Sequence, residues 1–352
     1  MVIEARVPSC EANRSRDMGG IVLGIESTAH TFSIGWVDGL GVPGKSVSAF
    51  VRPVEGGIHP REAADHHAEH AGRILRELLD SEVDVAEVKA IAYSQGPGLG
   101  PCLRIGASVA RSLATQMDVP LVGVNHCVAH IEVGRERCDC DDPVLLYASG
   151  GNTQVIARLD GRYRVLGETL DIGIGNMLDK FAREQGIAFP GGPKIEKLAL
   201  EWLAENPNPS LDGLELPYAV QGMDLAFSGI LNAALKLVEK GVPLPAVCWS
   251  LQEHTFAACV EVAERAMAHA GKSELLLGGG VACNERLRGM CEVMSLSRGA
   301  TSHVPEKFLC IDNGSMIATL GRLQLLWGSP TTLDHSGVRQ DLRTDETPIL
   351  WN

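Results

Sequence analysis

Two histidines four residues apart are the first side chains whose type and spacing could do chemistry. His126 and His130 occupy positions i and i+4 of a segment expected to be helical, so both imidazoles can reach one metal ion from one helical face. The residue directly after His126 is Cys127. The motif therefore lacks the Glu that occupies this position in HExxH metallopeptidases and serves there as the general base. A pair of packed histidines without a metal is the alternative interpretation.

A second histidine pair has the same spacing. His66 and His70 lie in a long amphipathic segment beside Glu62, Asp65 and Glu69, surroundings that are typical of a solvated helix face. Spacing alone does not choose between the two pairs.

Glycine-rich turns at the ends of expected strands could hold a phosphate, because glycines expose backbone N–H groups without a Cβ in the way. The clearest turns are residues 149–153 and 278–284, and neither matches a P-loop or a Rossmann fingerprint. Several such turns in one chain favour a nucleotide cleft. Asp171, Asp179 and Glu196 lie near Gly/Pro loops and could bind ribose hydroxyls or a metal.

The elements that must position these residues form two similar arrays. Strands are expected at 21–25 and 32–37 around a polar turn, and again at 144–148 and 154–159 around the turn 149–153. Further strands are expected at 47–51, 88–93, 121–124, 163–168 and 274–277, with helices at 62–80, 102–117, from 126, 176–184, 194–204, 228–239, 245–270, 284–295 and 311–327. The alternation predicts an α/β fold of two related lobes.

Composition excludes several function classes. With 352 residues, 45% of them hydrophobic, the chain can fill the cores of two domains and is not disordered throughout. It has no apolar run near the ~20 residues that span a bilayer. The net charge of −13 argues against a generic cationic coat for nucleic acid, but leaves room for a local basic patch or a basic partner. Ten cysteines without a CxxC pair predict reduced thiols in a cytoplasmic protein.

Eight motifs in order resemble the universal tRNA threonylcarbamoyl transferase family, in its archaeal and eukaryotic form, the catalytic subunit of the KEOPS complex. The resemblance runs from about residue 21 to the end of the chain. It departs from the family pattern at Ser27, where Gly is frequent, and at Ile311, where Thr is usual. The motifs are GIESTAHT at 24–31, GIHPREAA at 57–64, SQGPGLG at 94–100, NHCVAH at 125–130, SGGNT at 149–153, GNMLDK at 175–180, GGGVACN at 278–284 and DNG at 312–314.

The resemblance implies two ribonuclease-H-like lobes around a nucleotide cleft, as in the actin, sugar-kinase and Hsp70 ATPase superfamily. It also implies a reaction: the threonylcarbamoyl group passes from threonylcarbamoyl-AMP to N6 of the adenosine 3′ of the anticodon, in tRNAs reading codons that begin with A, with release of AMP. A small-molecule kinase of the same fold is the alternative. A metallopeptidase and a non-enzymatic ATP-binding scaffold are weaker ones.

The resemblance also implies site residues and cofactors. One divalent metal, iron first and zinc as the alternative, would be held by His126, His130, Tyr147 and Asp312, which decides between the two histidine pairs. Glu26 and His30 are candidates for handling a proton. An adenine nucleotide, either the donor or ATP, would lie along residues of the second lobe, namely Tyr147, Ala148, Ser149, Gly150, Gly151, Asp179, Gly192, Glu196 and Asn284.

Partners and domain limits complete the expectations. The partners would be tRNA and the KEOPS kinase-like, small dimerising and regulatory subunits, with no membrane. A kinase domain fused to the chain is not expected. Residues 1–20 lack the apolar segment that a signal peptide requires, and are expected to be a flexible extension. The lobes are expected at 21–138 and 139–330, with 331–352 returning to the first lobe.

Overall fold

The computed structural model describes residues 16–51 and 59–351. Most of the expected extension at 1–20, and the start of the motif at 57–64, lie outside the described residues. The chain divides into two compact units: residues 1–141, 161–163 and 311–352 form unit 1, and residues 142–160 and 164–310 form unit 2. The described part contains no helix that is long and apolar enough to cross a bilayer.

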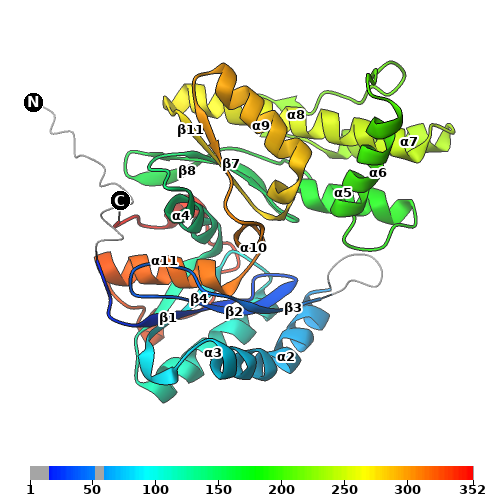
Figure 1. Ribbon diagram of the computed structural model, residues 1–352. Coiled ribbons are helices and arrows are strands. Elements are labelled where there is room, and N and C mark those ends of the chain that lie inside the picture. Colours follow the sequence, from blue (N-terminus) through cyan, green and yellow to red (C-terminus); the bar gives the residue numbers. More distant parts are fainter. Residues whose placement is uncertain (1–15, 52–58, 352) are drawn as a thin grey trace, which may run out of the picture. The chain divides into compact units, whose positions relative to one another are not determined.

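Unit 1 is built on a five-stranded sheet in the order β3-β2-β1-β4-β5, and Figure 1 labels its strands β1 to β4. β2 pairs antiparallel with β1 and β3, whereas β4 pairs parallel with β1 and β5. The strand bounds are β1 Ile21–Glu26, β2 Thr31–Val37, β3 Val47–Phe50, β4 Val88–Gly96 and β5 Leu121–Asn125. The expected first hairpin is therefore confirmed.

Helices cover both faces of this sheet (Figure 1). Apolar residues alternate along β1, because Leu23 and Ile25 join the core beneath α2 and α3 while Gly24 faces α11. The helix bounds are α2 Pro60–Ser81, α3 Gly100–Met117, α4 His126–Cys138 and α11 Gly314–Trp327, with short helical turns η1 Val85–Glu87, η3 Leu333–His335 and η4 Thr344–Glu346.

Unit 2 repeats the sheet pattern, in the order β12-β11-β6-β7-β8. β6 pairs antiparallel with β7 and parallel with β11, as β1 does with β2 and β4. The strand bounds are β6 Val144–Ala148, β7 Thr153–Leu159, β8 Arg162–Glu168, β11 Glu274–Gly278 and β12 Thr301–His303, with a separate pair, β9 Val220–Gln221 and β10 Asp224–Leu225. The second expected hairpin is confirmed.

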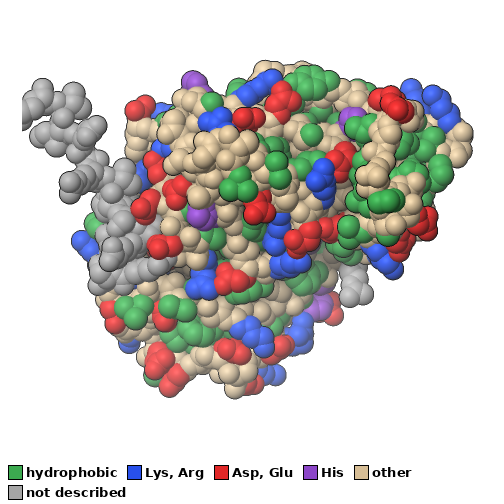
Figure 2. All heavy atoms as spheres, turned by 45° about the horizontal axis from the view of Figure 1, so that its top comes forward, with side chains coloured by type: hydrophobic (Ala, Val, Ile, Leu, Met, Phe, Trp, Pro, Cys, Tyr) green, Lys and Arg blue, Asp and Glu red, His purple; other side chains and the backbone are tan. Residues whose placement is uncertain are grey.

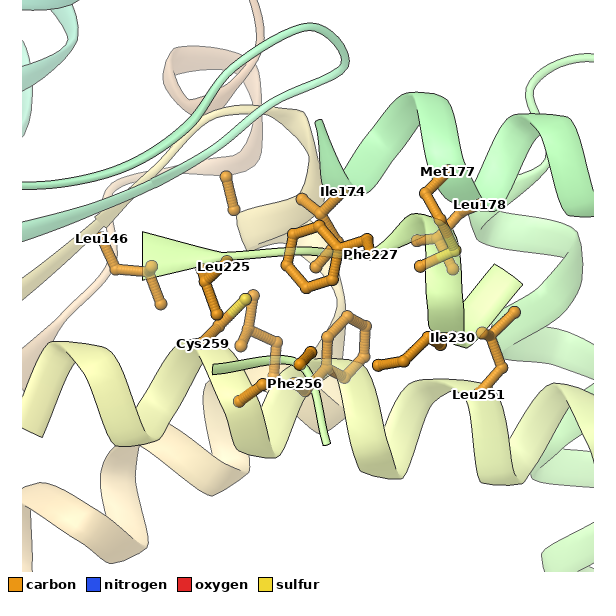
Figure 3. Packing of buried hydrophobic residues seen from close by; sticks show 14 of the residues in the cluster. Leu146, Ile174, Met177, Leu178, Leu225, Phe227, Ile230, Leu251, Phe256 and Cys259 are labelled. Carbon is orange, nitrogen blue, oxygen red and sulfur yellow. The ribbon is translucent and has the colours of Figure 1, made fainter. Parts of the chain in front are cut away.

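The core of unit 2 lies between this sheet and a layer of long helices. Figure 3 shows Leu146 of β6 on one side of the cluster, and Phe256 and Cys259 of α8 below it. This packing fixes the ends of β6 and β11, which carry the glycine turns. The helix bounds are α5 Ile174–Glu184, α6 Gly192–Glu205, α7 Ser228–Glu239, α8 Leu244–Ala270, α9 Glu285–Ser297 and α10 Lys307–Cys310, with the helical turn η2 Gly280–Cys283.

The structure corrects the expected limit of the second lobe. Residues 311–330 were assigned to it, but the division lies after Cys310, and α11 belongs to unit 1. The physical reason is packing: α11 lies against β1, β2 and β4 of the first sheet. Residues 161–163, at the start of β8, also group with unit 1.

Candidate metal centre and nucleotide turns

The first histidine pair lies in the first two turns of α4. Asn125 ends β5, and its side chain accepts hydrogen bonds from the N–H groups of Cys127 (2.9 Å) and Val128 (3.2 Å). This cap starts the helix at His126, directly after the strand. His126 and His130 therefore lie one turn apart, edge to face with ring centroids 4.9 Å apart, and both are buried.

Asp312 completes a cluster with these two histidines. It immediately precedes Asn313, whose side chain caps α11 by accepting a hydrogen bond from the N–H of Met316. Asp312 Oδ1 lies 3.2 Å from His130 Nε2 and 3.5 Å from His126 Nε2. Within residues 16–51 and 59–351, these three residues are the one group of three potential ligands whose ligand atoms all lie within 4.8 Å of one another.

The chemistry of this donor set fits a divalent first-row metal ion, because two imidazole nitrogens and one carboxylate suit iron or zinc. Burial lowers the pKa of His130 and so favours the neutral imidazole that a metal requires. Burial opposes ionisation of Asp312, but the neighbouring His126 and His130 outweigh burial and lower the pKa of Asp312. The cluster thus offers a carboxylate and a neutral imidazole to an ion.

Glu26 forms an outer layer behind His126. Its carboxylate is fully buried, and Oε2 lies 2.9 Å from His126 Nδ1. Oε1 accepts two hydrogen bonds from Thr28, one from the backbone N–H (2.6 Å) and one from the hydroxyl (2.5 Å). Burial lowers the pKa of His126, but the carboxylates of Glu26 and Asp312 outweigh burial and raise this pKa to about 9. Sequence analysis did not single out Thr28, because its position two residues after Glu26 is informative only once the turn is known.

The other histidines lie outside this cluster. His30 is one-third exposed, and its Nδ1 lies 4.0 Å from Asp312 Oδ2. The rings of His66 and His70 stack with centroids 4.2 Å apart, and His70 Nδ1 donates to the carbonyl of His66. In the described part of the chain, this second pair gathers no third ligand at metal-binding distance.

In unit 2, the two glycine turns lie side by side. β6 and β11 are parallel neighbours, with Gly278 opposite Tyr147. Gly279 has φ +87°, and a Cβ there would lie 2.4 Å from the carbonyl oxygen of Ala148. Glycine is therefore required where the second turn approaches the first.

The start of α5 closes onto the 149–153 turn. The N–H groups of Gly175 and Asn176 donate to the carbonyls of Ser149 (3.0 Å) and Gly150 (2.9 Å). The Ser149 hydroxyl donates to the carbonyl of Asn152 (2.9 Å) and fixes the shape of the turn. Gly151 remains exposed at its tip.

The remaining expected nucleotide residues lie at, or hydrogen-bond to, the starts of helices in unit 2. Asp179 accepts a hydrogen bond from the N–H of Gly191 (2.7 Å), next to Gly192 at the start of α6. Glu196 accepts from the N–H of Glu285 (2.8 Å) at the start of α9.

Asn284 caps α9, and its amide donates to Gln252 (2.7 Å). Asp171 is engaged structurally, because its carboxylate accepts from the N–H groups of Phe227 and Ser228 (2.9 Å each) at the start of α7.

Comparison with models of known protein families identifies the family of this chain. The sequence model of TsaD, described as tRNA N6-adenosine threonylcarbamoyltransferase, matches residues 46–319. The chain belongs to this family. The resemblance inferred from the ordered motifs is confirmed, and the comparisons give no support to the kinase alternative.

Archaeal relatives of this transferase cover nearly the whole chain. A tRNA N6-adenosine threonylcarbamoyltransferase of Methanocella arvoryzae is 52% identical over 94% of this chain and 98% of its own length. A probable bifunctional tRNA threonylcarbamoyladenosine biosynthesis protein of Methanothermobacter thermautotrophicus is 49% identical over 94% of this chain and 61% of its own length. The chain therefore spans about three-fifths of the bifunctional relatives that it matches.

Solved structures confirm the predicted fold of the transferase. HypF of T. kodakarensis superposes with a TM-score of 0.59 at 17% identity, over 88% of this chain and 48% of that protein. Component A of the (R)-2-hydroxyglutaryl-CoA dehydratase of Acidaminococcus fermentans superposes with a TM-score of 0.52 at 13% identity, over 85% of this chain and 96% of that protein. The chain therefore shares its α/β fold with these two proteins.

Proposed function

We propose that the transferase moves a threonylcarbamoyl group from threonylcarbamoyl-AMP to N6 of the adenosine 3′ of the anticodon, in tRNAs reading codons that begin with A. The observation that carries the proposal is the buried His126, His130 and Asp312 cluster in a chain of this family. In the reaction, N6 forms a bond to the carbamoyl carbon, and the bond from that carbon to the phosphate oxygen breaks. AMP leaves with the electron pair, and one proton leaves N6.

We propose that His126, His130 and Asp312 hold one divalent metal, with Tyr147 as the further ligand that the resemblance implies. Iron is the proposed metal and zinc the alternative. When bound, such an ion supplies Lewis acidity to an oxygen of the donor.

The residues of unit 1 prepare and surround the ligands. Glu26, held by Thr28, accepts the Nδ1 proton of His126, so the proton that a metal would displace is the one on Nε2, the nitrogen that faces Asp312. This contact supports a positioning role for Glu26 in place of the general base considered from sequence. His30 is the more exposed of the two candidates and lies near Asp312, so we assign to it the proton released from N6.

The residues of unit 2 would bind the adenylate. The turn at Ser149, Gly150 and Gly151 offers backbone N–H groups to the α-phosphate, and Tyr147 and Ala148 lead into it on β6. The ribose and base would lie along Asp179 of α5 and the starts of α6 and α9, which carry Gly192, Glu196 and Asn284. ATP would occupy the same residues.

We propose KEOPS-type partners, namely a kinase-like, a small dimerising and a regulatory subunit, and a cytoplasmic location. The bifunctional names of relatives support a second activity that works with this one. On the face drawn in Figure 2, the described acidic and basic side chains are interspersed. With a net charge of −13, partners that supply cations would help to hold the tRNA phosphates.

The test is nucleoside mass spectrometry of an unmodified tRNA with a suitable anticodon. The tRNA is incubated with threonylcarbamoyl-AMP and the metal-loaded protein, with and without the partner subunits. Modified adenosine that depends on this protein supports the proposal, and its dependence on partners tests the assembly. No product in any condition, with intact donor, would overturn it.

A further inference from the structure

Two cysteines of unit 2 lie on elements that pack together, although they are 27 positions apart in the sequence. Cys283 ends η2 and Cys310 ends α10, and these two elements pack together. The Cys283 thiol donates to the carbonyl of Lys307 on α10 (3.8 Å), and the Cys310 thiol donates to the carbonyl of Pro305, just before that helix (3.5 Å). Cys283 is half-buried, whereas Cys310 is fully buried. One thiol of the pair is therefore open to a small reagent, and the second lies behind it.

The surroundings of Cys283 favour its thiolate. Arg288 donates from Nε to the carbonyl of Ala282 (2.7 Å), and its buried Nη2 has no hydrogen-bond acceptor among the described residues. Lys307 lies 3.3 Å from Glu285 at the start of α9. The nearby Cys310 thiol, together with the charges of Arg288 and Lys307, outweighs burial and the carboxylate of Glu196 and lowers the pKa of Cys283 to about 7. Cations and a helix N-terminus are the setting in which thiols become reactive.

A second cysteine pair provides a matched comparison within the same unit. Cys259 of α8 and Cys291 of α9 are near enough to interact, but both are fully buried among apolar side chains. Burial raises the pKa of Cys291 to about 12 and raises that of Cys259 as well. In both pairs the two cysteines lie near each other. Only the pair of Cys283 and Cys310 has a thiol that solvent can reach and cations close to it.

We propose that Cys283 and Cys310 form a reversible disulfide when the protein meets a peroxide. The Cys283 thiolate attacks one peroxide oxygen, so an S–O bond forms, the O–O bond breaks, and hydroxide leaves and becomes water. The Cys310 sulfur then attacks the sulfenic acid, so the S–S bond forms and the second water leaves with the Cys310 proton. The two thiols are oxidised by two electrons and the peroxide is reduced. A dithiol restores both thiols by exchange.

The disulfide would tie η2 to α10, two elements that already pack against each other. Lys307 and Glu285 link α10 to the start of α9 in the same place. The proposal does not require the transfer reaction, although Cys283 lies within the turn at 278–284, next to Asn284, and Cys310 lies two residues before Asp312.

The test uses the full chain, treated with increasing hydrogen peroxide, quenched with catalase, alkylated under denaturing conditions and mapped without reduction. We expect a peptide pair joined at Cys283 and Cys310, about 2 Da lighter than the two thiol peptides. It should form at peroxide levels at which Cys259 and Cys291 are still fully alkylated, and should disappear after dithiothreitol.

Two variants keep the result decisive. In Cys310→Ser the cross-link cannot form, and Cys283 should accumulate as a sulfenic acid that dimedone traps. In Cys283→Ser, Cys310 should remain a thiol. The proposal is overturned if Cys283 stays alkylatable when the buried thiols oxidise, if it pairs with another cysteine, or if Cys310→Ser yields no dimedone adduct.

Discussion

Replacement of Glu26 by Gln would show whether a buried carboxylate sets the proton of His126. Glu26 Oε1 accepts two hydrogen bonds from Thr28, so a Gln side chain must place its amide oxygen there. Its NH2 group then faces His126 Nδ1, 2.9 Å away in the native protein. Because an NH2 group donates and does not accept, the proton of a neutral His126 must move to Nε2. That nitrogen is the one nearest Asp312, and it would no longer offer a lone pair to a metal.

The expected loss follows from this change of tautomer. Removal of an outer-layer partner of a metal-bound histidine costs 10–100-fold in affinity, or about 1.4–2.7 kcal/mol. The assay is titration of metal-free Glu26→Gln with Zn²⁺ or Fe²⁺ against a chromophoric chelator, with transfer activity measured separately. Glu132→Gln is the matched control, because Glu132 is equally buried on α4 but binds Tyr163 (2.5 Å) and Arg135 (2.9 Å). It should lose stability and keep its metal affinity within about two-fold.

One pattern of results would refute the reasoning. If Glu26→Gln binds metal as tightly as the native protein but loses transfer activity, Glu26 acts as a base in the reaction and does not position His126. If both Gln variants lose metal affinity equally, the effect is a general loss of fold in unit 1.

Four further outcomes are expected. His126→Ala should lose more metal affinity than Glu26→Gln in the same chelator competition, since it removes a ligand outright. Gly314→Ala should lower the free energy of unfolding in urea by about 1–3 kcal/mol, because its Cβ would lie 2.1 Å from the nitrogen of Gly35. Burial lowers the pKa of His67 to about 4, so the unfolded chain binds more protons than the folded chain between pH 6.5 and 4. The free energy of unfolding should therefore fall by up to about 3 kcal/mol as the pH drops through that window. In urea titrations, His67→Gln should reduce this dependence of stability on pH. Alkylation of Cys283 by iodoacetamide should reach half its maximal rate near pH 7, and saturating AMP should slow it, because the next residue is in the proposed nucleotide site.

Much of the fold could be predicted because its elements carry strong local patterns. The hairpins at the start of each sheet show apolar runs around polar turns, and the long helices show a 3.6-residue period. The elements that were missed are short: β12 has three residues and α10 has four. Such segments are too brief to show a period, and they form because neighbours hold them. The limit of the second lobe was misplaced for a related reason, since the partner of α11 is decided by packing and not by its own sequence.

The metal cluster likewise combines residues that are close in the sequence with one that is distant in it. His126 and His130 can be paired from their spacing, because both lie on one helix. Asp312 follows His130 by 182 residues, and no spacing rule joins it to them; it entered only through the resemblance. In the structure, its position depends on three glycines that let α11 lie against β1 and β2. A Cβ on Gly24 would lie 2.1 Å from the carbonyl oxygen of Gly314, and one on Gly35 would lie 2.5 Å from the nitrogen of Ser315. These glycines, which have no chemistry of their own, are thus what brings the carboxylate to the histidines.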